Sequence, residues 1–345
     1  MRPWGVVLLV FLSLFLVGCL NTAESPEGGG DSAVTKTAPE TVHLKVVTSV
    51  SPITSIVENI GGDRIDLQSI IPEGVNSHTY EPAPSVAKLM ANADLIVLNG
   101  LYLEQPALQM AEANKQPDAV ILLLGDNTIT RDQWAFDFSF PQYEGHPNPH
   151  LWPNPMFALK YAELVQAQLI KLDPDNIEYY SENLDKFRQR IEALDQAIKT
   201  ASDTVPPNNR KLLTYHDSWA YFAQRYGWKV VGAAQPSDFS EPSAREVAAL
   251  IDQIKENHLP AVFGSEVFPS PVLETIAKES GAVFIDKLRD DDLPGKPGDP
   301  RHSYLGLMVQ NMEIMMPALG GSADAFASVD TSPVFEGKSN AVYPQ

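Results

Sequence analysis

The sequence predicts an α/β protein of two lobes with mostly parallel sheets, joined by one long backbone helix. Three features of the 345-residue chain favour this class. Short runs rich in Val, Ile and Leu alternate with helical stretches, the alternation occurs twice, and a long amphipathic stretch lies between the two sets. A chain of this length has room for two ordinary domains.

Each lobe is expected to hold a set of short buried strands. The apolar runs have the length of strands that are covered on both faces of a parallel sheet. The first lobe spans residues 43–174, with runs at 43–50, 65–71, 94–99 and 119–124. The second lobe spans residues 206–321, with runs at 210–216, 228–234, 260–265 and 282–286.

The helix between the lobes is predicted over residues 175–205. Apolar side chains recur there at intervals of three and four: Ile177, Tyr180, Leu184, Phe187, Ile191, Leu194, Ile198 and Ala201. A coiled-coil dimer seam would show the same pattern. The position of the stripe between two βα sets favours one helix that bridges both lobes of a monomer.

Residues 1–18 are interpreted as a signal peptide. Arg2 supplies a positive charge, and the following apolar stretch is too short to span a bilayer comfortably. The stretch ends at Cys19, the only cysteine, in a sequence that resembles a bacterial lipoprotein cleavage box. We therefore expect a lipid on Cys19, a flexible tether over residues 19–42, and an extracytoplasmic protein anchored to a bacterial membrane. The alternative is an ordinary N-terminal membrane anchor with an incidental cysteine.

The chain is strongly acidic, with a formal net charge of −19. A protein of this charge repels phosphate backbones, which argues against nucleic acid as a partner. Two segments are expected to be solvated. The aspartate run 290–292 is interpreted as an exposed loop, and residues 322–345 as a loose tail.

Four side chains that can bind a metal follow apolar runs in different parts of the chain. His216 and Asp286 each end a run of the second lobe. His78 lies in the loop after a run of the first lobe, and His150 lies in a loop rich in Pro and Asn. Ligands of open α/β sheets bind beyond the carboxyl ends of the strands, so all four could reach one crevice between the lobes. Three imidazoles and a carboxylate form a complete ligand set for a divalent transition metal.

Five other residues are weaker candidates near such a site. His146 and His302 could assist metal capture. Glu266 follows another strand and could replace the aspartate ligand, although a role as a hydrogen-bond acceptor behind the ligands is favoured. Tyr80 and Glu81 could orient the first histidine, and simple packing of Tyr80 is an equal alternative.

The sequence motifs around the three histidines resemble those of a known family. This family is the cluster A-I metal-binding lipoproteins of bacterial ABC transporters for zinc and manganese. The three histidine motifs are similar to residues 74–84 (GVNSHTYEPAP), 148–153 (NPHLWP) and 215–222 (YHDSWAYF). Residues 241–244 (EPSA) and 303–306 (SYLG) extend the likeness. It covers about residues 43–320, which is nearly the whole predicted folded part.

The resemblance implies two lobes joined by one long helix, a buried metal between them, and delivery of that metal to a membrane permease. It implies ligand roles for the same four residues, His78, His150, His216 and Asp286. The chain departs from the family pattern at Asn148, where the family often has Asp. It also lacks the His-rich acidic loop of some zinc-binding members.

The sequence favours Zn²⁺ over Mn²⁺ as the metal. Family members described as manganese proteins tend to have Glu at the third position, where this chain has His216. Three nitrogens and one carboxylate suit zinc, and manganese or iron is the alternative. Because binding needs neutral imidazoles, metal affinity is predicted to fall as the pH drops through about 6.

Catalysis is disfavoured by the same ligand set. Four protein ligands leave no position for a reactive water on the metal. The chain also has no HExxH motif, no Gly-x-Ser-x-Gly motif and no phosphate-binding loop. The alternatives to a metal carrier are a secreted metallohydrolase, a surface adhesin and a protein that captures an organic solute.

Overall fold

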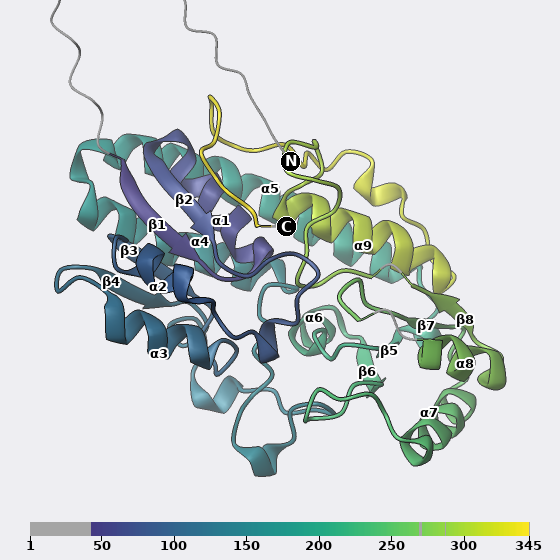
Figure 1. Ribbon diagram of the computed structural model, residues 1–345. Coiled ribbons are helices and arrows are strands. Elements are labelled where there is room, and N and C mark those ends of the chain that lie inside the picture. The colour runs from purple at the N-terminus through teal and green to yellow at the C-terminus, as the bar shows by residue number, and fades with distance from the viewer. Residues whose placement is uncertain (1–42, 269–270, 287, 345) are drawn as a thin grey trace, which may run out of the picture. The chain divides into compact units, whose positions relative to one another are not determined.

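The computed structural model describes residues 43–268, 271–286 and 288–344. The predicted signal peptide, Cys19 and the tether lie outside the described residues. Within the described ranges, two four-stranded parallel sheets and their helices form two lobes (Figure 1), so the predicted α/β class is confirmed. No helix in these ranges is long and apolar enough to cross a membrane.

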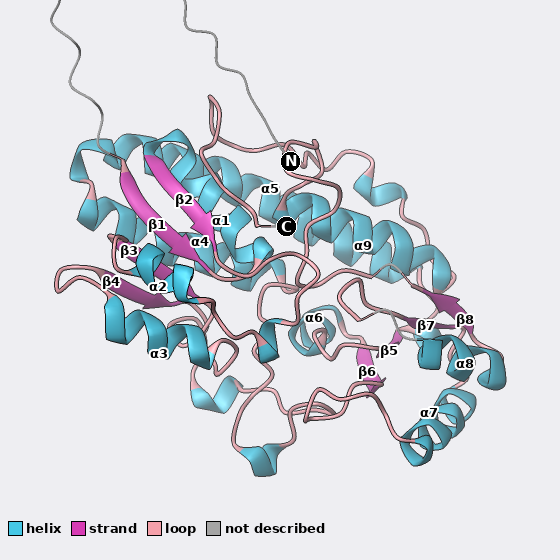
Figure 2. Cartoon of the chain, in the orientation of Figure 1, coloured by secondary structure: helices cyan, strands magenta, loops and turns pink. Residues whose placement is uncertain are grey.

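The first lobe contains a sheet with the strand order β2-β1-β3-β4. Its strands are β1 (Leu44–Thr48), β2 (Ile65–Ser69), β3 (Leu95–Leu98) and β4 (Val120–Leu123). Its helices are α1 (Ser51–Gly61), α2 (Pro84–Met90) and α3 (Gln105–Asn114). The connections after β1 and β2 run in opposite directions along the sheet, so right-handed crossovers place α1 on one face and α2 and α3 on the other (Figure 2).

The second lobe repeats this plan with the strand order β6-β5-β7-β8. Its strands are β5 (Lys211–Thr214), β6 (Lys229–Ala233), β7 (Ala261–Phe263) and β8 (Val283–Ile285). Its helices are α6 (Ala220–Tyr226), α7 (Ala244–Asn257), α8 (Pro271–Ser280) and α9 (Tyr304–Ala318). All eight predicted runs therefore contain strands, in the part of the chain that the structure describes.

Two long helices follow β4 in the chain: α4 (Pro155–Leu172), which packs with α1 of the first lobe, and α5 (Ile177–Thr204). The predicted linking helix is α5, which has 28 residues. Every residue of its apolar stripe is buried except Ile177, which is exposed at the first turn. The stripe contacts α1 and α4 in the first lobe and α6 and α9 in the second, so this face bridges both lobes.

The segment after Gly321 was expected to be a loose tail, but its described part packs against the first lobe. Phe326, Val334 and Tyr343 are buried, and Val342 forms a parallel bridge with Gln68 of β2. These apolar residues are too irregularly spaced to show a helical or strand period. Their burial could therefore not be predicted from the periodicity of the sequence.

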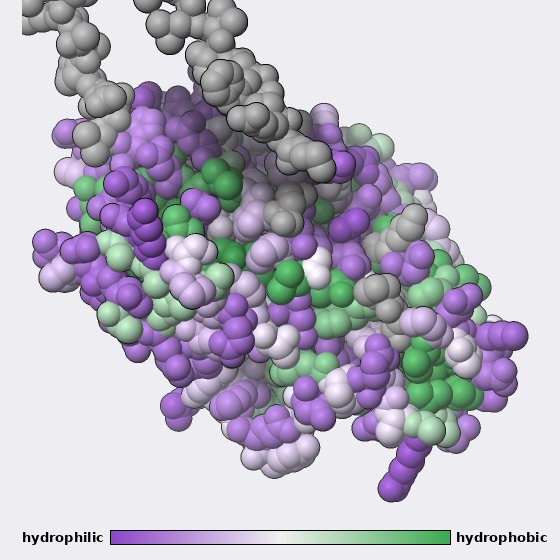
Figure 3. Space-filling model, viewed as in Figure 1, coloured by the Kyte–Doolittle hydropathy of each residue, from purple (hydrophilic) through white to green (hydrophobic). Residues whose placement is uncertain are grey.

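The face of the molecule drawn in Figure 3 is mostly hydrophilic. A small hydrophobic group lies over α8 and the edge strand β8 (Figure 3), where Val283 is 60% exposed. Single apolar side chains on a surface are common and do not mark a binding site by themselves. This hydrophobic group is therefore not assigned as a functional site.

Candidate metal centre

Three histidines that are far apart in the sequence converge in the structure. The Nε2 atom of His78 lies 3.2 Å from Nε2 of His150 and 3.0 Å from Nε2 of His216. His150 and His216 are buried, whereas His78 is partly exposed. The three rings meet edge to edge, at interplanar angles of 66°, 89° and 90°. This arrangement points three ring nitrogens at one place, as a shared ligand requires.

Each histidine is placed by a short loop at the end of a strand or the start of a helix. His78 lies in a 3-10 turn (Ser77–Thr79) after β2, and its backbone N–H donates to the side chain of Asn76. His150 lies five residues before the start of α4, and His216 lies two residues after β5. Only His216 lies directly beyond a strand end, whereas His78 and His150 lie in longer loops of the first lobe.

Asn148 fixes the orientation of the His150 ring. The Nδ2 group of Asn148 donates to the backbone oxygen of Asp217 at 2.6 Å and to Oδ2 of Asp137 at 2.9 Å. The amide oxygen is therefore an acceptor, and it lies 2.9 Å from Nδ1 of His150. Nδ1 must carry the proton, which leaves the lone pair of Nε2 facing the other two histidines.

A carboxylate lies against the outer nitrogen of His216. Oδ2 of Asp290 is 2.7 Å from Nδ1 of His216, although the oxygen does not lie along the ring N–H direction. Burial alone would lower the pKa of His216, but the charges of Asp290, Asp291 and Glu266 outweigh it and raise this pKa to about 9. Without a metal, His216 therefore holds a proton at neutral pH.

The other two histidines are neutral at the same pH. Burial lowers the pKa of His78 and of His150 well below the ordinary value, and the charge of His216 adds to the effect. A cation in place of the His216 proton would meet three nitrogen lone pairs. Metal binding at this position is therefore an exchange of one proton for one metal ion.

The aspartate run 290–292 was expected to be a solvated loop, and the structure shows that it is buried. Asp290, Asp291 and Asp292 are 4%, 3% and 7% exposed. The Oε1 atom of Glu266 accepts hydrogen bonds from the backbone N–H groups of all three, at 2.9, 3.2 and 3.1 Å. Glu266 thus holds this acidic loop in place, as a hydrogen-bond acceptor behind the site.

Asp291 is the member of the loop with a free buried oxygen. Its Oδ2 accepts from Oγ of Ser77 at 2.6 Å, whereas its Oδ1 is buried without a hydrogen-bond partner. Ligand atoms of His216, Asp290 and Asp291 lie within 4.8 Å of one another. Asp290 contacts the outer nitrogen of His216, so Asp291 is the carboxylate of this second group that has an oxygen without a hydrogen-bond partner.

Asp286, the aspartate singled out in the sequence, is placed differently. It is exposed directly after β8, and it lines a surface pocket with Glu266 and Phe268. Among the described residues, it belongs to neither group of converging metal-ligand atoms. Asp290, which contacts His216, is the fourth residue after Asp286 in the sequence. The ligand role of Asp286 therefore stays a prediction from the sequence, which this arrangement of side chains does not support.

Two of the weaker candidates lie outside the site. His146 is exposed, and its ring stacks on Tyr102 with the ring centres 4.1 Å apart. Glu81 is exposed.

Two others have structural contacts at some distance from the histidines. The hydroxyl of Tyr80 donates to the backbone oxygen of Ile70 at 2.7 Å, which fixes the base of the His78 loop. His302 is buried, and its Nε2 lies 3.9 Å from Oε1 of Glu73. Neither belongs to the groups of converging ligand atoms in the described part of the chain.

Two aromatic residues that the sequence did not suggest cover the exposed side of His78. The Phe239 ring stacks on the His78 ring, with the centres 4.4 Å apart and the planes at 12°. Phe140 lies 5.5 Å from the same ring. Phe239 has a left-handed backbone, with φ of 58°, which is rare for a large side chain. No local sequence pattern marks such a position.

The family comparison covers most of the chain. Residues 46–318 match the family described as zinc-uptake complex component A, periplasmic (ZnuA). The manganese-binding lipoprotein MntA of Halalkalibacterium halodurans is 27% identical over 313 residues, which cover 90% of this chain and 96% of that protein. The iron ABC transporter substrate-binding lipoprotein MtsA of Streptococcus pyogenes serotype M1 is 30% identical over 322 residues, covering 90% and 97%.

A solved structure has the same fold. The periplasmic zinc binding protein TroA from Treponema pallidum matches with a TM-score of 0.73 at 25% identity, over 81% of this chain and 100% of that one. These likenesses confirm the resemblance seen in the histidine motifs and the prediction that the chain is not an enzyme. The chain belongs to the ZnuA family, whose members are solute-binding components of transporters.

Proposed function

We propose that this protein binds one zinc ion outside the cytoplasm and delivers it to the membrane permease of an ABC transporter. The observation that carries the proposal is the convergence of three histidines beside buried carboxylates, with Nε2 of His78 3.2 Å from that of His150 and 3.0 Å from that of His216. Ligands about 2.0–2.1 Å from a tetrahedral ion are about 3.3 Å from one another. The side chains are thus close to the spacing that a bound ion would impose.

The proposed ligands are His78, His150, His216 and Asp291. The free Oδ1 of Asp291 supports its place in the set over Asp286, because a buried carboxylate oxygen without a partner gains most from a cation. Asn148 serves as the acceptor behind His150, and the carboxylate of Asp290 lies against the outer nitrogen of His216. Such outer partners fix the ring orientation and make the facing nitrogen a stronger ligand.

The choice of zinc rests on the donor atoms. Three imidazoles and one carboxylate favour a borderline metal such as Zn²⁺, whereas Mn²⁺ prefers sites richer in oxygen. The relatives named as manganese and iron carriers make those metals the alternative cargo. The second oxygen donor beside the site, Asp290, would favour this alternative if it turned toward the metal.

The location rests on the family and on the N-terminal sequence. The family is described as periplasmic and relatives are named lipoproteins, in agreement with a signal peptide over residues 1–18 and a lipid on Cys19. Mass spectrometry of the membrane fraction should find a chain that begins at Cys19 and carries acyl groups. A soluble chain that keeps residues 1–18 would contradict the anchor.

Metal analysis tests the proposed function directly. Protein purified without added metal or chelator should hold about one zinc per chain, and competition with a chromophoric chelator should rank zinc above manganese and iron. His150→Ala should lose this binding, whereas His146→Ala, which removes an exposed histidine, should keep it. A protein that binds no divalent metal would overturn the proposal, and tighter binding of manganese would favour the alternative cargo.

A further inference from the structure

Near the C-terminus, Val342 pairs with the edge strand β2 of the first sheet through an isolated parallel bridge. The N–H of Val342 donates to the oxygen of Leu67, and its oxygen accepts from the N–H of Ser69, both at 3.0 Å. β2 is the edge strand of this sheet, so these bonds occupy its free edge. Figure 1 shows this segment, in yellow, running beside β2. We call residues 340–344 the C-terminal strap.

The strap is fixed to the first lobe by its own buried tyrosine, Tyr343. The hydroxyl of Tyr343 donates to Oε2 of Glu58 at 2.6 Å, and its ring lies edge-on to His302 with the centres 4.8 Å apart. Tyr343 also packs with Leu293 and Leu307 in a small apolar cluster. Leu293 lies two residues after Asp291, so the strap contacts the segment that carries the proposed carboxylate ligand.

The strap also contacts the loop that carries His78. The N–H of Glu73, five residues before His78, donates to the oxygen of Pro344 at 3.3 Å. The side chain of the same glutamate accepts from the N–H of Leu293 at 3.3 Å. Glu73 therefore joins the strap, the His78 loop and the acidic loop at one point.

The two metal-carrying loops are tied to each other beside this point. The N–H of Gly74 donates to Oδ2 of Asp292 at 2.8 Å, and Ser77 donates to Asp291. These loops come from different lobes, so the bonds hold one lobe to the other at the site. Anything that stabilises their contact also stabilises the geometry in which His78 faces His216.

We propose that the C-terminal strap is a positioning element of the metal site, which holds the His78 loop against the acidic loop and slows release of the metal. The inference rests on the proposed function, because it needs a metal at these histidines. It goes beyond the family, whose match ends at residue 318. Because coupling is reciprocal, a strap that favours the metal-bound loops must itself be stabilised by the metal.

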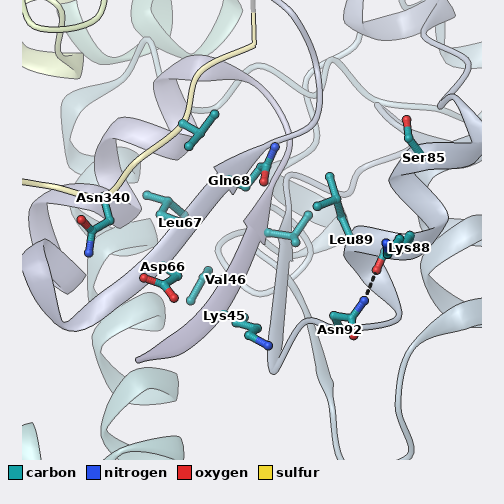
Figure 4. Close-up of a pocket in the computed structure, with 12 residues that line it drawn as sticks. Lys45, Val46, Asp66, Leu67, Gln68, Ser85, Lys88, Leu89, Asn92 and Asn340 are labelled. Carbon is teal, nitrogen blue, oxygen red and sulfur yellow. Dashed lines mark hydrogen bonds between the residues drawn. The ribbon is translucent and has the colours of Figure 1, made fainter. Parts of the chain in front are cut away.

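One side of the strap lines a surface pocket, whereas Tyr343 on the other side is buried. A cavity of about 680 Å³ lies beside the strap. Its lining residues include Asn340, Lys45, Lys88 and Leu89 (Figure 4). Val342 is 49% exposed on this side. A chain that ends at Ser339 loses the strap but keeps every strand and helix of the first lobe.

The first experiment measures the rate of zinc release into excess chelator by stopped-flow. Tyr343→Ala and the chain that ends at Ser339 should release zinc roughly tenfold faster than the full chain, since each loses buried contacts at the loops. Tyr343→Phe keeps the ring and should change the rate about twofold. Tyr143→Ala, which alters a highly exposed tyrosine in another loop, should leave it unchanged.

The second experiment distinguishes coupling from a general loss of stability. Hydrogen exchange of the full chain should show slower exchange of the Val342 and Tyr343 amides with zinc than without it. Equal exchange in both states, or equal release rates in Tyr343→Ala and the full chain, would overturn the strap proposal alone. A full chain that binds no zinc would overturn the proposed function, and this inference with it.

Discussion

Asn148 is the residue whose chemistry decides which nitrogen of His150 faces the other two histidines. Its amide lies between Asp137 and Asp217, and it donates to both residues. Burial and the nearby Asp217 raise the pKa of Asp137 to about 9. An aspartate at position 148 would add a third carboxyl to this buried pair, whereas a neutral amide does not.

Removing the amide should weaken metal binding without removing a ligand. Asn148→Ala leaves Nδ1 of His150 without its acceptor, so the ring loses its fixed orientation. Zinc affinity is expected to fall roughly 10–100-fold, as is usual when an outer partner of a metal ligand is lost. Competition titration checks this, with the exposed Asn92→Ala as control. Unchanged affinity would contradict the role assigned to Asn148.

The raised pKa of His216 changes the pH dependence that the sequence predicted. The metal needs the neutral ring, and in the metal-free protein the ring is protonated below about pH 9. Zinc affinity should therefore rise up to tenfold for each pH unit from about 6 to 9, rather than fall only below 6. Calorimetry in two buffers of different ionisation enthalpy should find about one proton released per zinc at pH 7.5. Zero proton release would contradict this account.

At the scale of elements, α5 is held to the second lobe by one buried charge. Asp195 of α5 accepts from Nε of Arg225 at 2.5 Å and from the hydroxyl of Tyr226 at 2.7 Å, both at the end of α6. Lys199 of the same helix also contacts Asp195, at 2.6 Å. Burial alone would raise the pKa of Asp195, but these hydrogen bonds lower it to about 2.

The low pKa of Asp195 makes this contact sensitive to acid. The pKa is lower in the folded state than in the unfolded one, so the stabilisation is present above about pH 4 and is lost as the pH falls toward 2. Asp195→Asn should lower the free energy of unfolding by about 2 kcal/mol at pH 7 and by much less near pH 2. Urea unfolding at both values checks this, with the exposed Asp185→Asn of the same helix as control. An equal loss at both pH values would contradict it.

The elements that the sequence could predict are those with a repeating pattern. The stripe from Tyr180 to Ala201 showed one buried helix face, and the apolar runs showed the strands, because burial on a regular element repeats with its period. The histidines could be predicted because each lies close to such an element or within a family motif. Asp291 and the strap could not, since each depends on the path of an irregular loop. The run of three aspartates suggested an exposed loop. Its neighbouring residues in the sequence do not show that the distant Glu266 accepts hydrogen bonds from its backbone.

At the scale of the molecule, the site exists only when the two lobes meet. His78 and His150 come from the first lobe, and His216 and Asp291 from the second. A metal ion held by all four ties the lobes together. Zinc should therefore stabilise the fold as a whole rather than one lobe.

Metal removal measures this stabilisation. At free zinc one hundred times the dissociation constant, the free energy of unfolding should rise by about 2.7 kcal/mol, which raises the melting temperature by several degrees. A chelator should reverse the change. His150→Ala should show no response to zinc, and a zinc response retained in this variant would contradict the site.

The most direct test of the whole account is the position of the metal in a zinc-soaked crystal, located by anomalous scattering at the zinc edge. The account predicts one strong peak about 2.0–2.2 Å from Nε2 of His78, His150 and His216 and from an oxygen of Asp291. A peak at Asp286, or a peak that is coordinated by fewer than three of these histidines, would contradict it.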